Sequence, residues 1–300
     1  MQKIDRLVWA EGMCIESYGM KIGIRATRAG MWDQLSPFLP PRWETIEPPR
    51  KLDLLYSWVV GGGRRPRVRT FDLLYQGVGR IIRTLKPADL FEAFETDLRT
   101  TIALRSRRFV FIHAGVVGWR GRAIVIPGRS LTGKSTLVEA LVRAGAEYLS
   151  DEYAVLDGRG RVHPYAKPIS MRVPATFRQE PRTVEEIGGR TAERAMSVGA
   201  ILVTRHREDV RPRFRAASAG QGVLDLVANA VAVRHAPSRV LRATSNAGTN
   251  VIVLRGARGE AREAVEELLR ILDERKGLYQ EVRRGGLNGV TGRYTLAAEG

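Results

Sequence analysis

The residues with the clearest chemical character lie in the segment "PGRSLTGKST", between Pro127 and Thr136. From Gly128 to Ser135 the segment follows the spacing G-x-x-x-x-G-K-[ST], which in a chain of this composition is expected roughly 0.007 times by chance. Glycine allows backbone conformations that other side chains block, so successive N–H groups can curl around a polyphosphate. The spacing therefore predicts a phosphate-binding loop formed by Gly128, Arg129, Ser130, Leu131, Thr132, Gly133, Lys134, Ser135 and Thr136.

The flanks of this segment fit such a loop. The apolar run "AIVI" precedes it and predicts a strand, and "LVEALVRAGA" follows it and predicts a helix. The positive end of that helix would face the bound anion. Lys134 is then expected to reach the β- and γ-phosphates, and the Ser135 hydroxyl to bind Mg²⁺. The predicted cofactors are ATP and Mg²⁺.

A phosphate loop does not by itself distinguish a kinase from an ATPase or a GTPase, so the nearby carboxylates matter. Asp151 and Glu152 follow Lys134 by 17 and 18 residues, in "EYLSDEYAVLD". Two adjacent side chains on a strand point to opposite faces, which predicts different roles for the two. One would hold Mg²⁺ together with Ser135, and the other would accept a proton from an attacking hydroxyl. The alternative is a solvated acidic turn between two strands.

Histidine and cysteine usage limits the remaining chemistry. His113 ends the apolar run "FVFIHAG" just before the loop strand, and it is either a hydrogen-bonded core residue or part of the site. The other three histidines have no metal-ligand spacing, so no zinc site is expected. Cys14 is the single cysteine, which excludes an intrachain disulfide and fits a reducing cytoplasm.

The start of the chain has acidic residues and no apolar core, so no signal peptide is expected. No run approaches 18 apolar residues, so no membrane span is expected either. The net charge of +17 comes mainly from 42 arginines, and it has two interpretations. A basic surface attracts nucleic acids or acidic peptides. However, the arginines are scattered and no aromatic residues alternate with them as in a base-stacking surface, which disfavours nucleic acid as a partner.

Periodicity predicts an α/β fold with a smaller α+β module in front of it. Residues 1–100 form the front module, residues 101–276 the core domain, and residues 277–300 a loose tail. Residues 35–51 are proline-rich and are expected to be loop. The expected strands are 20–27, 52–63, 108–115, 122–128, 153–157, 168–173, 200–205 and 250–256. The expected helices are 87–107, 134–146, 220–234 and 259–275.

Residues 109–157 resemble the catalytic core of the HPr kinase/phosphorylase family, in its HPr-kinase-related branch. His113 precedes Lys134 by 21 residues and Asp151 follows it by 17, and the family keeps both intervals. The resemblance implies a P-loop kinase core of the HPr kinase/PEP carboxykinase type, a mixed sheet flanked by helices. It extends to about residue 275 but does not include residues 1–100.

The family's residue roles carry over onto matching positions. The resemblance implies that Asp151 is the general base, that Glu152 and Ser135 bind Mg²⁺, and that His113 poises Asp151. It also implies that Lys134 neutralises the transferred phosphoryl group and that Arg172, in "PISMR", contacts phosphate. Arg258, in "RGARGEA", is a further candidate for a phosphate contact.

The chain also departs from the family pattern. Leu131 stands where the family loop has a third glycine, and the acidic pair is Asp-Glu rather than Asp-Asp. The loop that binds HPr is shortened, which disfavours HPr itself as the substrate and the reverse phosphorylase reaction. Related kinases of this branch are associated with peptide-tailoring systems in which a serine of a precursor peptide is the acceptor. Related kinases also assemble as oligomers, so the resemblance allows a homo-oligomer.

The leading hypothesis is an ATP- and Mg²⁺-dependent kinase that phosphorylates a hydroxyl, a serine of a peptide or small protein. A second hypothesis keeps the chemistry but takes a small metabolite, such as free serine or a sugar, as the acceptor. A third is a regulatory nucleotide-binding module or a nucleic-acid-dependent ATPase, which predicts hydrolysis stimulated by DNA or RNA and no phosphorylated acceptor. An inactive, degenerate kinase completes the alternatives.

Overall fold

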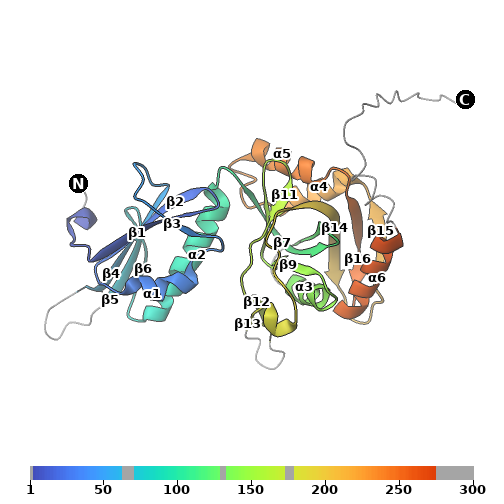
Figure 1. Ribbon diagram of the computed structural model, residues 1–300, viewed down its shortest axis with the longest axis horizontal. Helices are drawn as coiled ribbons and strands as arrows, with labels where there is room; N and C mark the ends of the chain where they lie inside the picture. Colours follow the sequence, from blue (N-terminus) through green and yellow to red (C-terminus); the bar gives the residue numbers. More distant parts are fainter. Residues whose placement is uncertain (1–2, 63–70, 129–132, 173–178, 275–300) are drawn as a thin grey trace, which may run out of the picture.

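The structure is a computed structural model, and it describes residues 3–62, 71–128, 133–172 and 179–274. The described strands form a six-stranded sheet, an eight-stranded sheet and a two-stranded ribbon. The chain is therefore mixed α/β, as the sequence predicts. The six-stranded and eight-stranded sheets lie side by side along the long axis of the molecule (Figure 1).

The first sheet has the strand order β3-β1-β2-β4-β5-β6. Its strands are β1 (Glu11–Ser17), β2 (Met20–Ala26), β3 (Glu44–Ile46), β4 (Leu54–Gly62), β5 (Phe71–Gln76) and β6 (Gly79–Thr84). All neighbours pair antiparallel except β2 and β4, which run parallel. The short helix α1 (Met31–Leu35) and the long helix α2 (Pro87–Arg105) complete this module.

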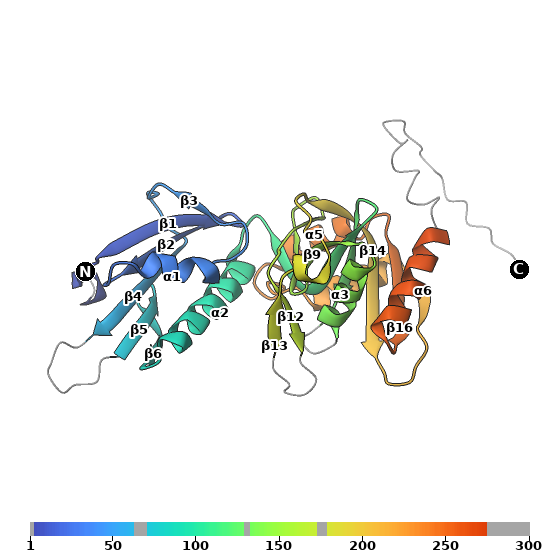
Figure 2. The same ribbon diagram turned by 60° about the horizontal axis from the view of Figure 1, so that its bottom comes forward.

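Helix α2 connects the two modules. Pro87 occupies its first turn, where no N–H partner is needed, and this suits proline. Leu90, Phe94, Leu98 and Ile102 recur every four residues and are buried in the core of the first module. The helix continues past the expected module boundary at residue 100. In both views it lies on the side of its sheet nearest the second sheet (Figure 1, Figure 2).

The second sheet follows the order β11-β10-β7-β8-β14-β16-β15, with β9 paired to β7. Its strands are β7 (Val110–Trp119), β8 (Arg122–Pro127), β9 (Glu147–Ser150), β10 (Tyr153–Leu156), β11 (Arg161–His163), β14 (Met196–His206), β15 (Arg213–Ala217) and β16 (Ile252–Arg258). Strands β8, β14 and β16 run parallel. Strand β11 also pairs with β14, which closes β11, β10, β7, β8 and β14 into a ring of paired strands.

Helices cover both faces of the second sheet. One hydrophobic cluster joins one face of the sheet to α3 (Lys134–Arg143) and α6 (Ala261–Glu274). The other face packs on α4 (Ala219–Ala228) and α5 (Pro237–Ala247). The two-stranded ribbon consists of β12 (Ile169–Arg172) and β13 (Gln179–Arg182). This module is a three-layered α/β/α arrangement.

Most of the elements with strong periodicity are present, with shifted ends. The expected helix 220–234 ends at Ala228, and α5 follows it as a separate helix. The expected loop 35–51 contains the short strand β3, which pairs with β1. The expected tail, residues 277–300, lies outside the described residues. Within the described residues, no helix is both long enough and apolar enough to cross a membrane.

Candidate active site

The two ends of the predicted phosphate loop lie where a strand meets a helix. Strand β8 ends at Pro127, and the N–H of the next residue, Gly128, donates to the carbonyl of His113 at 3.0 Å. Helix α3 begins at Lys134 after Gly133, whose φ of 77° is left-handed. Glycine adopts this conformation without steric cost. The four loop residues between these ends, Arg129, Ser130, Leu131 and Thr132, lie outside the described residues.

Arg258, the last residue of β16, supports the end of this loop. Its Nη2 donates to the carbonyl of Gly133 at 2.8 Å and its Nη1 to the carbonyl of Gly259 at 3.0 Å. Only 2% of Arg258 is exposed, and burial lowers the pKa of its guanidinium. Arg258 therefore holds the main chain at Gly133, where the loop meets α3. This contact differs from the phosphate contact that the sequence suggested.

The geometry at Gly133 gives a first testable expectation. A Cβ at this position would lie 2.5 Å from Nη2 of Arg258, and the left-handed φ would add strain. Gly133→Ala should therefore destabilise the fold by about 1–3 kcal/mol and weaken ATP binding. Urea unfolding and calorimetric titration with ATP and Mg²⁺ would measure both effects.

Gly121 offers a matched control for this substitution. It has a similar φ of 79°, but a Cβ there would meet nothing within 4 Å. Gly121→Ala should show only the cost of the backbone conformation and should leave ATP affinity unchanged. Equal losses of stability and affinity in the two variants would contradict the role of the contact between Gly133 and Arg258.

Ser135 and Asp151 meet directly. The Ser135 hydroxyl donates to Oδ2 of Asp151 at 2.9 Å, which joins the first turn of α3 to the segment after β9. The Tyr148 hydroxyl lies 3.0 Å from Oδ1 of Asp151 and 3.0 Å from the carbonyl of Lys167, and its single proton serves one of them at a time. Burial raises the pKa of Tyr148, so this residue stays a donor. The family resemblance implies Glu152, and not Asp151, as the carboxylate that binds Mg²⁺ together with Ser135.

The acidic pair lies in a break between two strands and not within a strand. Strands β9 and β10 both pair with β7, and residues 151 and 152 form the bend between them. The buried hydroxyl of Ser150 accepts hydrogen bonds from the N–H groups of Glu152 at 3.0 Å and Tyr153 at 2.9 Å, which fixes this bend. The two carboxylates therefore reach different partners because of the bend, and strand alternation is not the cause.

Glu152 points to the first module. Its Oε1 lies 3.1 Å from Nε of Arg99, and Nη1 of Arg99 donates to its Oε2 at 3.3 Å. Burial raises the pKa of Glu152, whereas the nearby charges of Arg99 and Lys167 oppose this rise. Burial lowers the pKa of Arg99, but the attraction of Glu152 and other negative groups outweighs it and raises the pKa overall.

Lys134 and His113 lie in the same charged region. Burial lowers the pKa of Lys134, and the charges of Asp151 and Glu152 counteract this. The pKa of His113 falls below its usual value through burial first and then through the charges of Lys134 and Arg99, so its imidazole is neutral at pH 7. The His113 ring lies 5.1 Å from the ring of Tyr153, between centroids. The carbonyl of His113 thus accepts a hydrogen bond from Gly128, and its neutral ring lies near the charges of Lys134 and Arg99.

The structure brings together most of the predicted site residues that it describes. One region contains Lys134, Ser135, Asp151, Glu152 and His113. Thr136 is exposed on the first turn of α3. Arg172 ends β12, but its side chain lies outside the described part of the structure. Within the described residues, no group of three or more His, Cys, Asp or Glu side chains could hold a metal ion.

Sequence reasoning missed several residues of this region: Arg99, Tyr148, Ser150 and Lys167. Tyr148 lies three residues before Asp151, and a bulge in β9 shifts the pairing there, because Val116 and Val117 of β7 face Ser150 and Tyr148. Such a bulge has no signal in the spacing of the sequence. Arg99 comes from the other module, so its approach depends on how the two modules pack.

Neither a scan against protein-family models nor a search of curated proteins gave a match to this chain.

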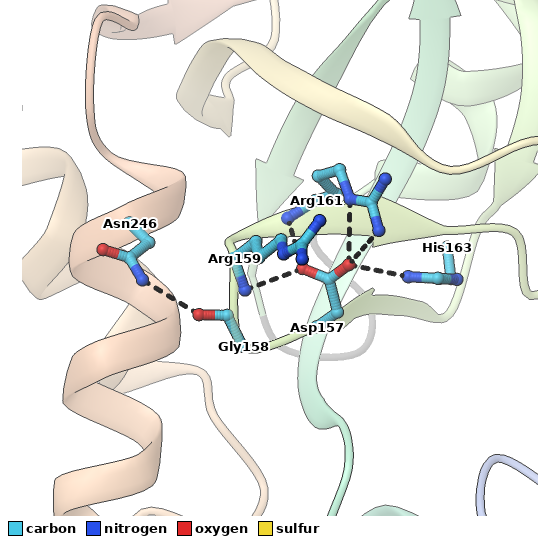
Figure 3. Close-up of polar contacts among 6 residues, drawn as sticks. All are labelled: Asp157, Gly158, Arg159, Arg161, His163 and Asn246. Atoms are coloured by element: carbon cyan, nitrogen blue, oxygen red, sulfur yellow. Dashed lines mark hydrogen bonds and ion pairs between the residues drawn. The ribbon is translucent and has the colours of Figure 1, made fainter.

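A second polar cluster lies at the far end of β10, in the turn that leads to β11. Oδ1 of Asp157 accepts from the N–H groups of Arg159 at 2.9 Å and Arg161 at 3.0 Å. Its Oδ2 accepts from Nε of Arg161 at 3.0 Å and lies 3.1 Å from Nε2 of His163 (Figure 3). Asn246 of α5 donates to the carbonyl of Gly158 at 2.9 Å and ties the turn to that helix. The cluster fixes the end of β10, the strand that follows Asp151 and Glu152.

This cluster predicts a pH-dependent stability. Burial raises the pKa of Asp157, but the hydrogen bonds from His163, Arg161 and Arg159 outweigh it and hold the pKa below its usual 3.8. The stabilisation is therefore complete above pH 3.8 and is lost as the pH falls through the depressed value. Asp157→Asn should lower the free energy of unfolding at pH 7 by about 1–3 kcal/mol, and this difference should shrink near pH 3.

Urea unfolding at the two pH values would test this expectation. The exposed Asp209 serves as a control, because Asp209→Asn should change little at either pH. A destabilisation by Asp157→Asn that is the same at pH 7 and pH 3 would contradict the assigned role of the carboxylate.

Proposed function

We propose that this chain is an ATP- and Mg²⁺-dependent kinase that transfers the γ-phosphoryl group to a hydroxyl, a serine of a peptide or small protein. It would be a P-loop kinase of the HPr-kinase-related type. The resemblance over residues 109–157 agrees with this function, since it includes the loop, the acidic pair and His113.

One contact carries this function more than any other: the hydrogen bond between Ser135 and Asp151. It joins the first turn of a helix that follows a glycine-rich loop to a carboxylate that is distant in the sequence. Lys134 on the same turn and Glu152 beside Asp151 complete a set of groups suited to phosphoryl transfer. A solvated acidic turn would not need a buried tyrosine and a loop serine as partners of its carboxylate.

The donor set suits Mg²⁺. This ion prefers oxygen ligands and is usually bound by one or two carboxylates together with substrate phosphates. Ser135 and Asp151 supply a hydroxyl and a carboxylate within 2.9 Å of each other. The hydroxyl proton points to Asp151, which leaves the lone pairs of the serine oxygen for a cation. When bound there, Mg²⁺ supplies positive charge that offsets the charge of the phosphates.

This geometry favours an exchange of the two acidic roles expected from the family. Asp151 faces Ser135 and would be the metal-side carboxylate. Glu152 would then accept the proton of the acceptor hydroxyl while the hydroxyl oxygen bonds to the γ-phosphorus and the bond to the ADP oxygen breaks. Lys134 would offset the charge on the transferred group, and the helix α3 N-terminus would add its dipole.

The first experiment tests which class of compound accepts the phosphoryl group. Purified protein would be incubated with ATP and Mg²⁺ and with three sets of compounds: serine-containing peptides, small hydroxyl metabolites, and DNA or RNA. Intact mass spectrometry would report the gain of a phosphoryl group, and phosphate release would report hydrolysis. A phosphorylated peptide is the expected result. Hydrolysis that nucleic acid stimulates, without any phosphorylated acceptor, would exclude the kinase function.

A further inference from the structure

The acidic pair is contacted by a helix of the other module. Helix α2 carries Glu95 and Arg99 four residues apart, and this spacing puts both side chains on one flank. Arg99 contacts Glu152 through two nitrogen–oxygen pairs, and Glu95 forms an ion pair with Lys167. Lys167 is the residue whose carbonyl lies beside the Tyr148 hydroxyl. One flank of α2 thus contacts both Glu152 and Lys167.

The position of α2 against the second module is fixed by a packed interface and not by a pair of exposed side chains. The Tyr18 ring of the first module packs edge-on against Phe111 of β7, with 5.4 Å between centroids. The Tyr18 hydroxyl donates to the carbonyl of Pro164 at 2.8 Å, and its carbonyl accepts from the buried hydroxyl of Ser106 at 2.9 Å. One hydrophobic cluster contains Tyr18 together with Phe111, Tyr153 and Tyr165.

We propose that Arg99 is a positioning residue for Glu152, so that the active site is assembled from both modules. This inference depends on the proposed function, because it requires Glu152 to face the phosphoryl acceptor. The guanidinium is planar and rigid, and it holds the carboxylate through one hydrogen bond from Nη1 and through the ion pair between Nε and Oε1. Residues 3–105 thereby gain a role that the kinase resemblance does not include: they set the geometry of the carboxylate in the second module.

The competing explanation is an ion pair that only holds the modules together. Such a pair would lower thermal stability when it is removed, but it would leave the turnover of the folded enzyme unchanged. A positioning residue would instead affect the turnover of the folded enzyme. Its removal should lower kcat, leave ATP affinity unchanged and loosen the bend that carries Glu152.

The test compares Arg99→Gln, Arg99→Lys and the control Arg105→Gln in the full chain. Arg105 lies on the same helix and is exposed. We expect Arg99→Gln to lower kcat by about 10- to 100-fold, with the affinity for ATP and Mg²⁺ unchanged in calorimetry. Arg99→Lys should recover part of the loss, and Arg105→Gln should match the wild type. Thermal unfolding would confirm that each variant is folded at the assay temperature.

A second measurement does not depend on catalysis. Hydrogen–deuterium exchange would follow the N–H groups of Glu152 and Tyr153, which donate to Ser150, and that of Ala114, which donates to the carbonyl of Glu152. Arg99→Gln should speed exchange at these groups by at least about tenfold, and Arg105→Gln should not.

The two readouts separate the possible failures. If wild-type protein phosphorylates no hydroxyl, the proposed function fails, and the exchange measurement still decides whether Arg99 holds the bend. If wild-type protein is a kinase but Arg99→Gln keeps full kcat and normal exchange, the positioning role is overturned. A loss of activity that merely follows a lower unfolding temperature would overturn it as well.

Discussion

Replacing Lys134 with alanine is expected to lower the rate of phosphoryl transfer by on the order of 100- to 1,000-fold. The ammonium group lies on the first turn of α3, where burial lowers its pKa and the charges of Asp151 and Glu152 raise it. No other described lysine stands on that turn. Its removal therefore takes away a charge that would be aimed at the transferred group. The initial rate of acceptor phosphorylation, at saturating ATP and Mg²⁺, is the measurement.

A lysine far from the site provides the comparison for this variant. Lys51 is exposed between β3 and β4, so Lys51→Ala should retain the wild-type rate. The Lys134→Ala protein should also stay folded, because the apolar face of α3 that contains Leu137, Val138 and Leu141 is unchanged. A folded Lys134→Ala variant with a near-normal rate would refute the assignment of this segment as a phosphate loop.

The second large effect concerns the two carboxylates, for which we propose the exchange of roles. Asp151→Asn keeps an oxygen that can accept from Ser135 but removes the negative charge. Loss of even an outer partner of a metal ligand costs about 10- to 100-fold in metal affinity, so the Mg²⁺-dependent affinity for ATP should fall at least that much. Calorimetric titration of ATP, with and without Mg²⁺, would measure this change.

Glu152→Gln should have the complementary effect. The loss of a general base lowers the rate by about 100- to 10,000-fold, whereas ATP affinity in the presence of Mg²⁺ should remain near normal. If Asp151→Asn instead keeps full Mg²⁺-dependent affinity and loses only phosphoryl transfer, Asp151 is the base. The roles expected from the family would then be the correct ones.

Local sequence signals were sufficient for the strand and the helix beside the loop. The apolar run before Gly128 is strand β8, and helix α3 begins at Lys134 as expected, because both depend on the pattern of neighbouring residues. The same holds for α2 and α6, whose apolar residues recur at helical spacing. The spacing also indicated that one carboxylate of the acidic pair would lie near Ser135, and the resemblance implied Glu152, whereas Asp151 is the one that Ser135 contacts.

Features that depend on packing between distant segments could not be predicted. Strand β15 includes part of the arginine-rich run at 211–215, and its position beside β16 has no periodic signal. Arg99 lies in an ordinary amphipathic helix, and only the docking of the modules brings it to Glu152. The bend at Ser150 determines that Asp151, and not Glu152, contacts Ser135. The Ser150 hydroxyl fixes this bend because it accepts hydrogen bonds from two N–H groups.

The proposed reaction of this site is the transfer of a phosphoryl group from ATP to a hydroxyl. The most direct measurement follows ATP labelled in its γ-phosphate, in the presence of Mg²⁺ and serine peptides. The label should appear on a serine oxygen of a peptide with wild-type protein, and Lys134→Ala and Glu152→Gln should each slow this transfer by at least about 100-fold. Label that is found only in free phosphate, or that reaches the peptide as fast with both variants as with wild-type protein, would contradict this function.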